Sequence, residues 1–341
     1  MNPGDRRGLG ERGPLVTTLG FGGTAIGNLY RARSDTEAAD TLQAAWEAGV
    51  RYFDTAPLYG LSLSEQRIGA FLRGRDRKDF VISTKVGRML DPLGEGEPAA
   101  VAAYVDVPRY RPRFDYTSDA ILRSFEASLE RLGLDHIDVL YLHDLTPMNH
   151  GGDEPFEVHY RSFFEQGGHE AMVDLRKAGR VGAIGIGVGH WQAAQRLITD
   201  GDFDACLLAG RYTLLEQEAL ESFLPLCQRR GVGVVIGGPY NSGILATGAV
   251  EGATYNYRPA PPHILARVRR IERVCAAHGV PLIAAALQFP LHHPAVASTI
   301  PGAGSVEEVR AAADTLATPV PSALYADLKT EGLIAAEAPV N

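Results

Sequence analysis

The sequence contains few cysteines, because Cys206, Cys227 and Cys275 are the only three in 341 residues. They lie far apart and form no CxxC pair, so they indicate neither a disulfide framework nor a zinc site. Reduced thiols are typical of a cytoplasmic protein, and we expect all three to fill the core. His292 and His293 are adjacent and have no carboxylate cluster nearby in the sequence. We therefore expect no metal, since neighbouring histidines do not readily share one ion.

Long hydrophobic runs and an excess of positive charge are also missing. No stretch reaches the roughly 18 apolar residues that a membrane-spanning helix needs, and residues 1–14 are polar, without the apolar segment of a secretory signal. The net charge is −8 and is spread along the chain. Nucleic-acid binding needs a basic face, so this charge argues against it. We expect a cytoplasmic protein that binds neither membrane nor nucleic acid.

Strand-like apolar runs recur along the chain, and each is followed by a segment with helical periodicity. The eight predicted strands are residues 16–21, 51–55, 80–84, 137–143, 182–188, 205–209, 233–237 and 297–300. The predicted helices are residues 36–48, 65–73, 118–132, 164–178, 191–200, 216–230, 263–278 and 306–315, with an extra helix at 281–291.

The clearest helix is the segment 118–132. Thr117 or Ser118 is placed to cap its first turn. Five apolar side chains fall at the spacing of one buried helix face, namely Ile121, Leu122, Phe125, Leu129 and Leu132.

Alternation of strands and helices predicts a parallel sheet, because parallel strands need crossover connections. Eight such units without a dividing linker favour one α/β domain over residues 1–341, folded as a single (β/α)8 TIM barrel, over two Rossmann halves. Functional residues of such a barrel lie at the carboxyl ends of the strands. Two long loops, 86–116 and 146–163, fall on that face and are expected to act as binding loops or lids.

Polar residues close three consecutive predicted strands. Asp54 and Tyr59 stand in GVRYFDTAPLYG, Lys85 in FVISTKVG and His143 in IDVLYLHD. Each alone has an ordinary structural explanation, but their joint occurrence at one barrel face indicates a site. Lysine is almost never buried without a partner, so we expect Lys85 to pair with Asp54 and to lower the pKa of Tyr59 from about 10. Tyr59 could then act as the base, and His143 could orient the substrate.

These stretches, with SFEASLERLGLDHIDVLYLHD and STIPGAGSVEEV, resemble the aldo-keto reductase family from about Leu19 to about Ala313. The resemblance implies a (β/α)8 barrel that moves a hydride between a nicotinamide and a carbonyl or alcohol. It also implies a catalytic tetrad in which Tyr59 transfers the proton, made of Asp54, Tyr59, Lys85 and His143.

The resemblance also implies where the cofactor binds, although the usual contacts are changed. A Ser-Asn pair and a Gln of the family are replaced by Gly189, His190 and Ala209, and the usual stacking aromatic residue is changed as well. His190, Arg211 and Tyr240 are therefore candidates to hold the nicotinamide ring. The full set of expected cofactor contacts is Gly23, Thr24, Asp54, Gly189, His190, Arg211, Gly238, Pro239, Tyr240, Asn241, Gly243, Gly302, Ser305 and Glu308.

The adenosine end indicates which cofactor is used. Family members that prefer NADP tend to carry Lys or Arg there, whereas this chain has Gly302 and Glu308. A carboxylate accepts a hydrogen bond from a ribose hydroxyl and repels a phosphate. We therefore expect NAD, with NADP less favoured, and an enzyme that works as a dehydrogenase.

The stretches VVIGGPYNSGIL and LLAGRYTLLEQ resemble the branch of bacterial aldose 1-dehydrogenases of the L-fucose and D-threo-aldose type and of pyridoxal 4-dehydrogenases. The expected reaction is oxidation of an aldose at C1 to the lactone, with a small sugar or alcohol as substrate. Pyridoxal oxidation and general aldehyde or ketone reduction remain alternatives. A non-catalytic nicotinamide-sensing subunit of an ion channel is an alternative of a different class. The sequence does not indicate the oligomeric state.

Two further motifs point to other oxidoreductase folds. In GFGGTA, Gly20, Gly22 and Ala25 have the spacing of a Rossmann phosphate loop. Helical periodicity resumes only near residue 34, which disfavours that interpretation. Tyr325 and Lys329 have the YxxxK spacing of short-chain dehydrogenases, but they fall in a predicted surface helix, and we expect a structural role for them.

Overall fold

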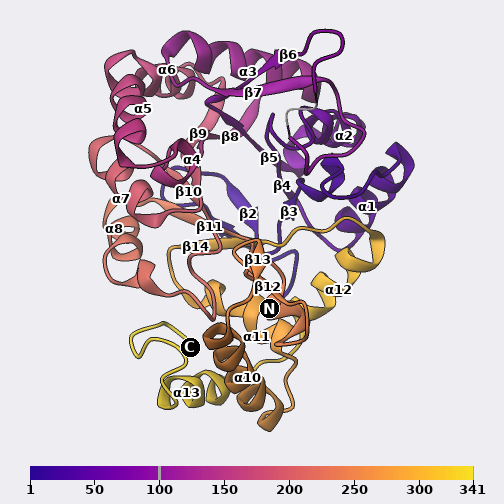
Figure 1. Cartoon of the computed structure of the whole chain (residues 1–341), viewed down its shortest axis with the longest axis vertical. Helices are drawn as coiled ribbons and strands as arrows, with labels where there is room; N and C mark the ends of the chain where they lie inside the picture. Colours follow the sequence, from indigo (N-terminus) through magenta and orange to yellow (C-terminus); the bar gives the residue numbers. More distant parts are fainter. Residues whose placement is uncertain (99–100, 341) are drawn as a thin grey trace.

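The computed structural model describes residues 1–98 and 101–340. Eight parallel strands form a barrel surrounded by helices (Figure 1). Its strands, in their order around the sheet, are β3 (Phe21–Gly22), β4 (Tyr52–Asp54), β5 (Val81–Val86), β8 (Ile137–His143), β9 (Val181–Val188), β10 (Ala205–Ala209), β11 (Gly233–Gly237) and β14 (Val296–Ile300). Parallel bridges from Leu19 to Thr299 and from Gly22 to Gly302 join β14 to β3. The predicted α/β barrel is confirmed.

The register of the strands brings the expected functional side chains to one end of the barrel. Asp54 on β4 pairs with Ser83 on β5, and Lys85 lies two residues further along β5. Side chains at positions i and i+2 of a strand point to the same face, so Ser83 and Lys85 share one face of β5. His143 is the last residue of β8 and pairs with Gly187 on β9.

The amino-terminal segment closes the other end of the barrel. β1 (Arg6–Gly8) and β2 (Leu15–Thr17) form an antiparallel hairpin. Leu9 and Val16 are fully buried there, in one cluster with the barrel residue Tyr52. The hairpin therefore fills the floor beneath the interior side chains of the barrel.

The prediction of one strand over residues 16–21 is wrong. Residues 15–17 belong to the hairpin, and only Phe21–Gly22 joins the barrel. Between these strands the backbone N–H of Gly20 donates to Thr299, so the chain is already crossing to the barrel wall. Both short strands bury apolar side chains, which makes the sequence pattern continuous across the break.

Most of the outer helices lie where the sequence predicts them, namely α1 (Asp35–Glu47), α2 (Leu63–Leu72), α3 (Ser118–Leu132), α7 (Trp191–Asp200), α10 (Pro262–Ala277), α11 (Leu282–Gln288) and α12 (Val306–Ala317). In α3 the Thr117 hydroxyl accepts from the N–H of Ala120 at 3.4 Å, and Gly133 ends the helix with φ of +62°. Four of its five apolar residues are buried, but Leu122 is 40% exposed, so that assignment is wrong.

The predicted helix 164–178 is two helices. α5 (Asp153–Glu165) ends just before Gly167, whose φ of +73° breaks the helix, and α6 (Gly168–Lys177) follows. The long loop predicted at 146–163 is therefore largely helical, since the short α4 (Pro147–His150) precedes α5.

The predicted helix 216–230 also starts too early. The structure has a 3₁₀ turn η3 (Glu218–Leu220), followed by α8 (Phe223–Arg230). Pro225 lies in the first turn of α8, where its missing N–H does no harm. If the helix began further upstream, the Pro225 ring would clash with the carbonyl four residues before it. The helix therefore begins close to Pro225. The predicted extra helix similarly ends in a 3₁₀ segment, η4 (Phe289–His292).

Several short elements complete the fold. The loop after β5 contains the hairpin of β6 (Arg88–Pro92) and β7 (Tyr110–Phe114), and the loop after β11 contains α9 (Ile244–Thr247) and the hairpin of β12 (Thr254–Tyr255) and β13 (Arg258–Pro259). The remaining elements are η1 (Ala25–Gly27), η2 (Arg77–Asp79) and α13 (Ser322–Thr330).

Two sequence expectations are settled by burial. Tyr325 in α13 is fully buried and donates its hydroxyl proton to the carbonyl of Ala285 at 3.0 Å, which confirms a structural role. All three cysteines are free thiols buried in the core, as expected. Among the described residues no single helix could cross a membrane; only Pro262–Ala277 and Leu282–His292 together reach the required length and composition, and they are bent by 99°.

Candidate active site

Asp54 and Lys85 form a buried ion pair at the carboxyl ends of β4 and β5. The Lys85 ammonium donates to both carboxylate oxygens of Asp54, at 2.8 and 2.7 Å, and to the carbonyl of Thr55 at 2.7 Å. Ser83 donates to Asp54 Oδ1 at 2.7 Å. Both ionic side chains are about 1% exposed. The expected pairing is confirmed.

Burial and ion pairing have opposite effects on these two groups. Burial raises the pKa of Asp54 and lowers the pKa of Lys85, and their mutual attraction counteracts both shifts. The lysine has three acceptors and the carboxylate three donated hydrogen bonds, so the charged pair is well satisfied. A fixed positive charge therefore lies next to the reaction face.

Tyr59 lies directly beside this charge. The Lys85 ammonium is 4.7 Å from the centroid of the Tyr59 ring, and the Thr24 side chain acts to lower the pKa of the phenol. Burial raises the pKa of Tyr59 well above its usual value, and the Asp54 and Asp144 carboxylates raise it further. The expectation of a lowered pKa is thus wrong for the protein alone. Tyr59 is a neutral phenol that holds a proton ready for transfer.

His143 faces Tyr59 from the end of β8. The two rings meet edge to face, with centroids 6.0 Å apart. Burial lowers the pKa of His143 well below its usual value, and the nearby charges of Arg88 and Lys85 lower it further. The imidazole is therefore neutral, so one ring nitrogen donates a hydrogen bond and the other accepts. The structure brings all four expected tetrad residues together.

Two charged residues of this site were missed from the sequence. Asp144 follows His143 directly, and its Oδ2 lies 3.4 Å from His143 Nε2. Arg88 donates to the same Asp144 oxygen at 2.6 Å. Both could have been noticed, because Asp144 directly follows the strand-end His143 and Arg88 follows Lys85 by three residues. Without the strand register, however, no sequence pattern connects these two residues.

The loops after β9 and β10 bring three expected cofactor residues together. Arg211 Nε donates to the carbonyl of Gly189 at 3.2 Å, and its NH1 donates to Asn256 Oδ1 at 3.0 Å. His190 caps α7, because its Nδ1 accepts the N–H of Ala193 at 3.2 Å. Arg211 therefore connects these loops to the β12–β13 hairpin.

The loop after β11 holds the next five expected residues in a tight turn. Gly238 and Gly243 have φ of +55° and +103°, a region that favours glycine. Asn241 is buried and donates to the Gly210 carbonyl at 3.1 Å. Tyr240, next to Pro239, has a buried hydroxyl without a hydrogen-bond partner in the described part of the chain.

The remaining expected residues divide between the tetrad and the start of α12. Gly23 donates its N–H to the Asp54 carbonyl at 2.8 Å. At the start of α12, Ser305 accepts the N–H of Glu308 at 3.3 Å, and Glu308 accepts the N–H of Gly304 at 2.7 Å. Glu308 is thus used partly as a cap of its own helix. A side chain at Gly302 would meet no atom within 4 Å, so its backbone borders open space.

Arg33 was also missed from the sequence and lies at this same place. Its Nε donates to the carbonyl of Gly304 at 2.8 Å. An arginine, a glycine bordering open space at Gly302 and the amino terminus of the 12-residue helix α12 suit the phosphates of a dinucleotide. The residues present therefore fit a nicotinamide dinucleotide running from α12 to the tetrad.

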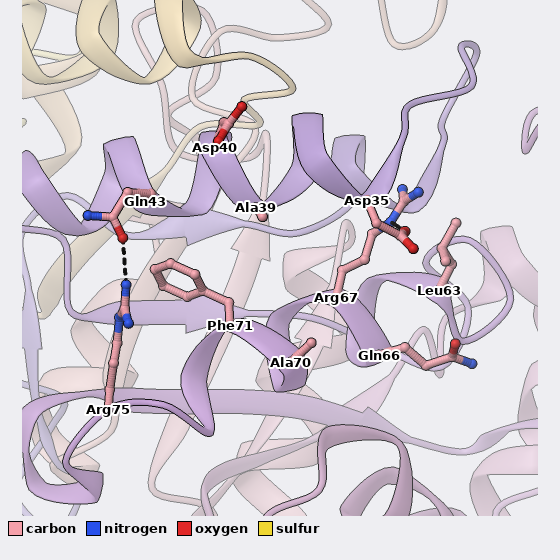
Figure 2. A pocket seen from close by; sticks show the side chains of 10 residues that line it. All are labelled: Asp35, Ala39, Asp40, Gln43, Leu63, Gln66, Arg67, Ala70, Phe71 and Arg75. Carbon is pink, nitrogen blue, oxygen red and sulfur yellow. Dashed lines mark hydrogen bonds and ion pairs between the residues drawn. The ribbon is translucent and has the colours of Figure 1, made fainter.

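A groove of about 700 Å³ lies between α1 and α2, away from the expected site residues. Figure 2 shows its lining, including the hydrogen bond of 2.7 Å from Arg75 to Gln43. Neither the tetrad nor an expected cofactor residue lines it. Within residues 1–98 and 101–340 there is also no group of three or more His, Cys, Asp or Glu side chains that could hold a metal ion.

Barrel strands that deliver a buried lysine–aspartate pair beside a tyrosine and a neutral histidine define a class of barrel oxidoreductases. Residues 18–330 match the Aldo/keto reductase family, and the chain belongs to that family. It is an oxidoreductase whose family uses nicotinamide cofactors. The resemblance stated from the sequence is confirmed.

Two curated relatives cover nearly the whole chain. D-threo-aldose 1-dehydrogenase of Pseudomonas sp is 42% identical, with 94% of this chain and 96% of the relative covered. Pyridoxal 4-dehydrogenase of Microbacterium luteolum is 39% identical, with 98% and 99% covered. Among solved structures, the holo form of an aldo-keto reductase from Bacillus halodurans has a TM-score of 0.75 and 27% identity, covering 98% of this chain and 97% of its own.

Proposed function

We propose that the protein oxidises an aldose at C1 with NAD, giving the lactone. The observation that carries this proposal is the Lys85 ammonium, which is bonded to Asp54 and lies 4.7 Å from the Tyr59 ring. The similarity to the D-threo-aldose dehydrogenase supports an aldose as substrate, L-fucose included in the class. We further infer that residues 1–341 act as one barrel unit in the cytoplasm, since its buried thiols are free.

In the proposed mechanism each tetrad residue has one task. Tyr59 first gives its phenol proton to solvent, and Lys85 stabilises the resulting phenolate by its charge. The phenolate then accepts the proton of the anomeric hydroxyl. Neutral His143 donates a hydrogen bond to the reacting oxygen and fixes its position. A bound NAD would supply the acceptor for the hydride from C1. Asp54 keeps Lys85 charged and in place, and water hydrolyses the released lactone to the acid.

The preference for NAD is supported by the start of α12. The Glu308 carboxylate lies there, bonded to the N–H of Gly304, and would repel a 2′-phosphate. Arg33 also lies there and donates its Nε to the Gly304 carbonyl, a position that we assign to the pyrophosphate, which both cofactors share. We expect kcat/KM to be higher with NAD than with NADP. A higher value with NADP would overturn this part of the proposal.

Pyridoxal is the second candidate substrate, because the pyridoxal 4-dehydrogenase is 39% identical over nearly the whole of both chains. Pyridoxal also presents a hemiacetal carbon to the same hydride acceptor. The tetrad would serve both substrates equally, so only the loops around it decide between them.

The test is a panel of aldoses and pyridoxal assayed with NAD, using the Tyr59→Phe variant as the diagnostic. Loss of the phenol should abolish turnover, by about 10²–10⁴-fold or more, while the Kd for NAD stays nearly unchanged. Tyr325→Phe is the matched control, because Tyr325 is buried beneath α11 and should leave turnover intact. Appreciable activity of Tyr59→Phe would show that the proton goes elsewhere.

A protein that binds NAD tightly and oxidises no member of the panel would favour the sensing subunit over the enzyme. Turnover of pyridoxal alone would favour the second candidate.

A further inference from the structure

We propose that Asp144, held by Arg88, binds the substrate hydroxyl on the carbon next to the reacting carbon. The inference rests on the proposed function, because it adds a specificity contact to the same site. It assigns to this ion pair the selection of hydroxylated substrates over simple aldehydes and alcohols.

The Asp144 side chain is held in one orientation. Arg88 NH2 bonds to its Oδ2 at 2.6 Å, and the two side chains are only 15% and 20% exposed. The Arg88 guanidinium is itself stacked over the Phe114 ring at 4.5 Å. Such a charge-assisted hydrogen bond between partly buried groups fixes geometry strongly.

The backbone at Asp144 is in the left-handed region, with φ of +55°, which a residue other than glycine adopts at an energetic cost. The N–H of Asp144 donates to the Gly187 carbonyl at 2.9 Å, and its own carbonyl accepts from Thr146 at 2.9 Å. These bonds maintain the unusual turn. Because of that turn, the carboxylate lies beside His143 at the end of β8.

The distance between the Asp144 carboxylate and His143 indicates which substrate group Asp144 can reach. Its Oδ2 is 3.4 Å from His143 Nε2, longer than a normal hydrogen bond. A substrate oxygen that accepts from His143 would stand close to this carboxylate. Oxygens on adjacent carbons are separated by about the length of one hydrogen bond, so the neighbouring hydroxyl comes within reach of Asp144.

The chemistry of the contact is set by the carboxylate. An ionised carboxylate only accepts hydrogen bonds, so it can bind a hydroxyl and repels a carbonyl or ether oxygen. Arg88 occupies Oδ2, and Oδ1 has no hydrogen-bond partner among the described residues. In an aldose oxidised at C1, the hydroxyl at C2 is the group that fits.

The experiment compares an aldose with its 2-deoxy analogue in the unmodified enzyme and in Asp144→Asn. The unmodified enzyme should prefer the aldose by kcat/KM on the order of tenfold to hundredfold, the usual effect of one hydrogen bond to a charged group. In Asp144→Asn this ratio should fall at least fivefold, mainly because kcat/KM for the aldose falls. Glu126→Gln is the matched control, because it removes one carboxylate on the outside of α3, paired there with Arg180, and the ratio should not change.

A positioning role alone gives a different result. If Asp144 only orients His143, Asp144→Asn lowers kcat for the aldose and its 2-deoxy analogue by the same factor, and the ratio stays constant. A constant ratio, whether activity falls or not, would overturn the inference. Absence of any aldose oxidation by the unmodified enzyme would instead overturn the proposed function.

Two additions make the result decisive in every case. If Asp144→Asn does not fold because Arg88 is left as an unpaired buried charge, the double variant Arg88→Met/Asp144→Asn removes both charges and carries the same comparison. Calorimetric Kd values for the aldose and the 2-deoxy analogue, measured with NADH present, test the contact without turnover. Equal Kd values for the two sugars in the unmodified enzyme would refute it.

Discussion

Replacing Lys85 by methionine is the sharpest test of the electrostatic argument. The ammonium lies 4.7 Å from the Tyr59 ring centroid; Lys85 is buried and Tyr59 is partly buried. Coulomb's law with an effective dielectric constant of about 20 gives about 3.5 kcal/mol of stabilisation for a phenolate at that distance. Each 1.36 kcal/mol corresponds to about tenfold in rate. We therefore expect kcat/KM for oxidation to fall by a few hundredfold in Lys85→Met.

The response of Asp54 determines how much of that loss is seen. Without Lys85, the buried Asp54 charge is unpaired and raises the pKa of Tyr59 further. The double variant Lys85→Met/Asp54→Asn removes this charge, so it should recover part of the lost activity. Lys177→Met is the control, because Lys177 is 71% exposed on α6 and its removal should have no effect on kcat/KM.

The assay is the absorbance of NADH formed from an aldose, followed across a range of pH. A loss of less than tenfold in Lys85→Met, with an unchanged pH profile, would refute the reasoning. It would mean that the charge of Lys85 is not what makes Tyr59 a usable base.

Two further predictions concern pH and stability. Burial raises the pKa of Tyr59 and lowers that of His143. Because the fraction of Tyr59 phenolate then grows tenfold per pH unit, log kcat/KM for oxidation should rise by about one per pH unit from about pH 6 to about pH 9. A plateau set by a group titrating near pH 6.5 would contradict the neutral histidine. Tyr325→Phe should lower the free energy of unfolding by about 1–3 kcal/mol, because the buried Ala285 carbonyl loses its donor. Urea denaturation measures this, and an unchanged midpoint would show that the bond contributes nothing.

The sequence predicted the barrel and the tetrad because both depend on local patterns. Apolar runs of five to seven residues with a polar residue at or near the end are visible without any knowledge of pairing. Asp54, Lys85 and His143 each close such a run, and parallel strands place their carboxyl ends together. Their assembly therefore followed from the fold class alone.

The elements that the sequence missed depend on contacts between distant residues. Nothing local distinguishes Leu15–Thr17, which pairs in a hairpin, from Phe21–Gly22, which pairs with β4. Arg88 and Asp144 are separated by 56 positions and meet only because β5 and β8 are neighbours. The raised pKa of Tyr59 depends on how much protein covers the ring, which a sequence does not show.

The hairpin of β1 and β2 gives the amino-terminal residues an effect on chemistry at the opposite end of the barrel. Leu9 and Val16 cover Tyr52, whose hydroxyl hydrogen-bonds to Ser83, the donor to Asp54. Removing the β1–β2 hairpin, or inserting a tag into it, would admit solvent at the end of the barrel that the hairpin closes. Water reaching that chain of hydroxyls would screen the charge pair, so we expect a protein altered only at its start to work more slowly although the proposed tetrad is unchanged.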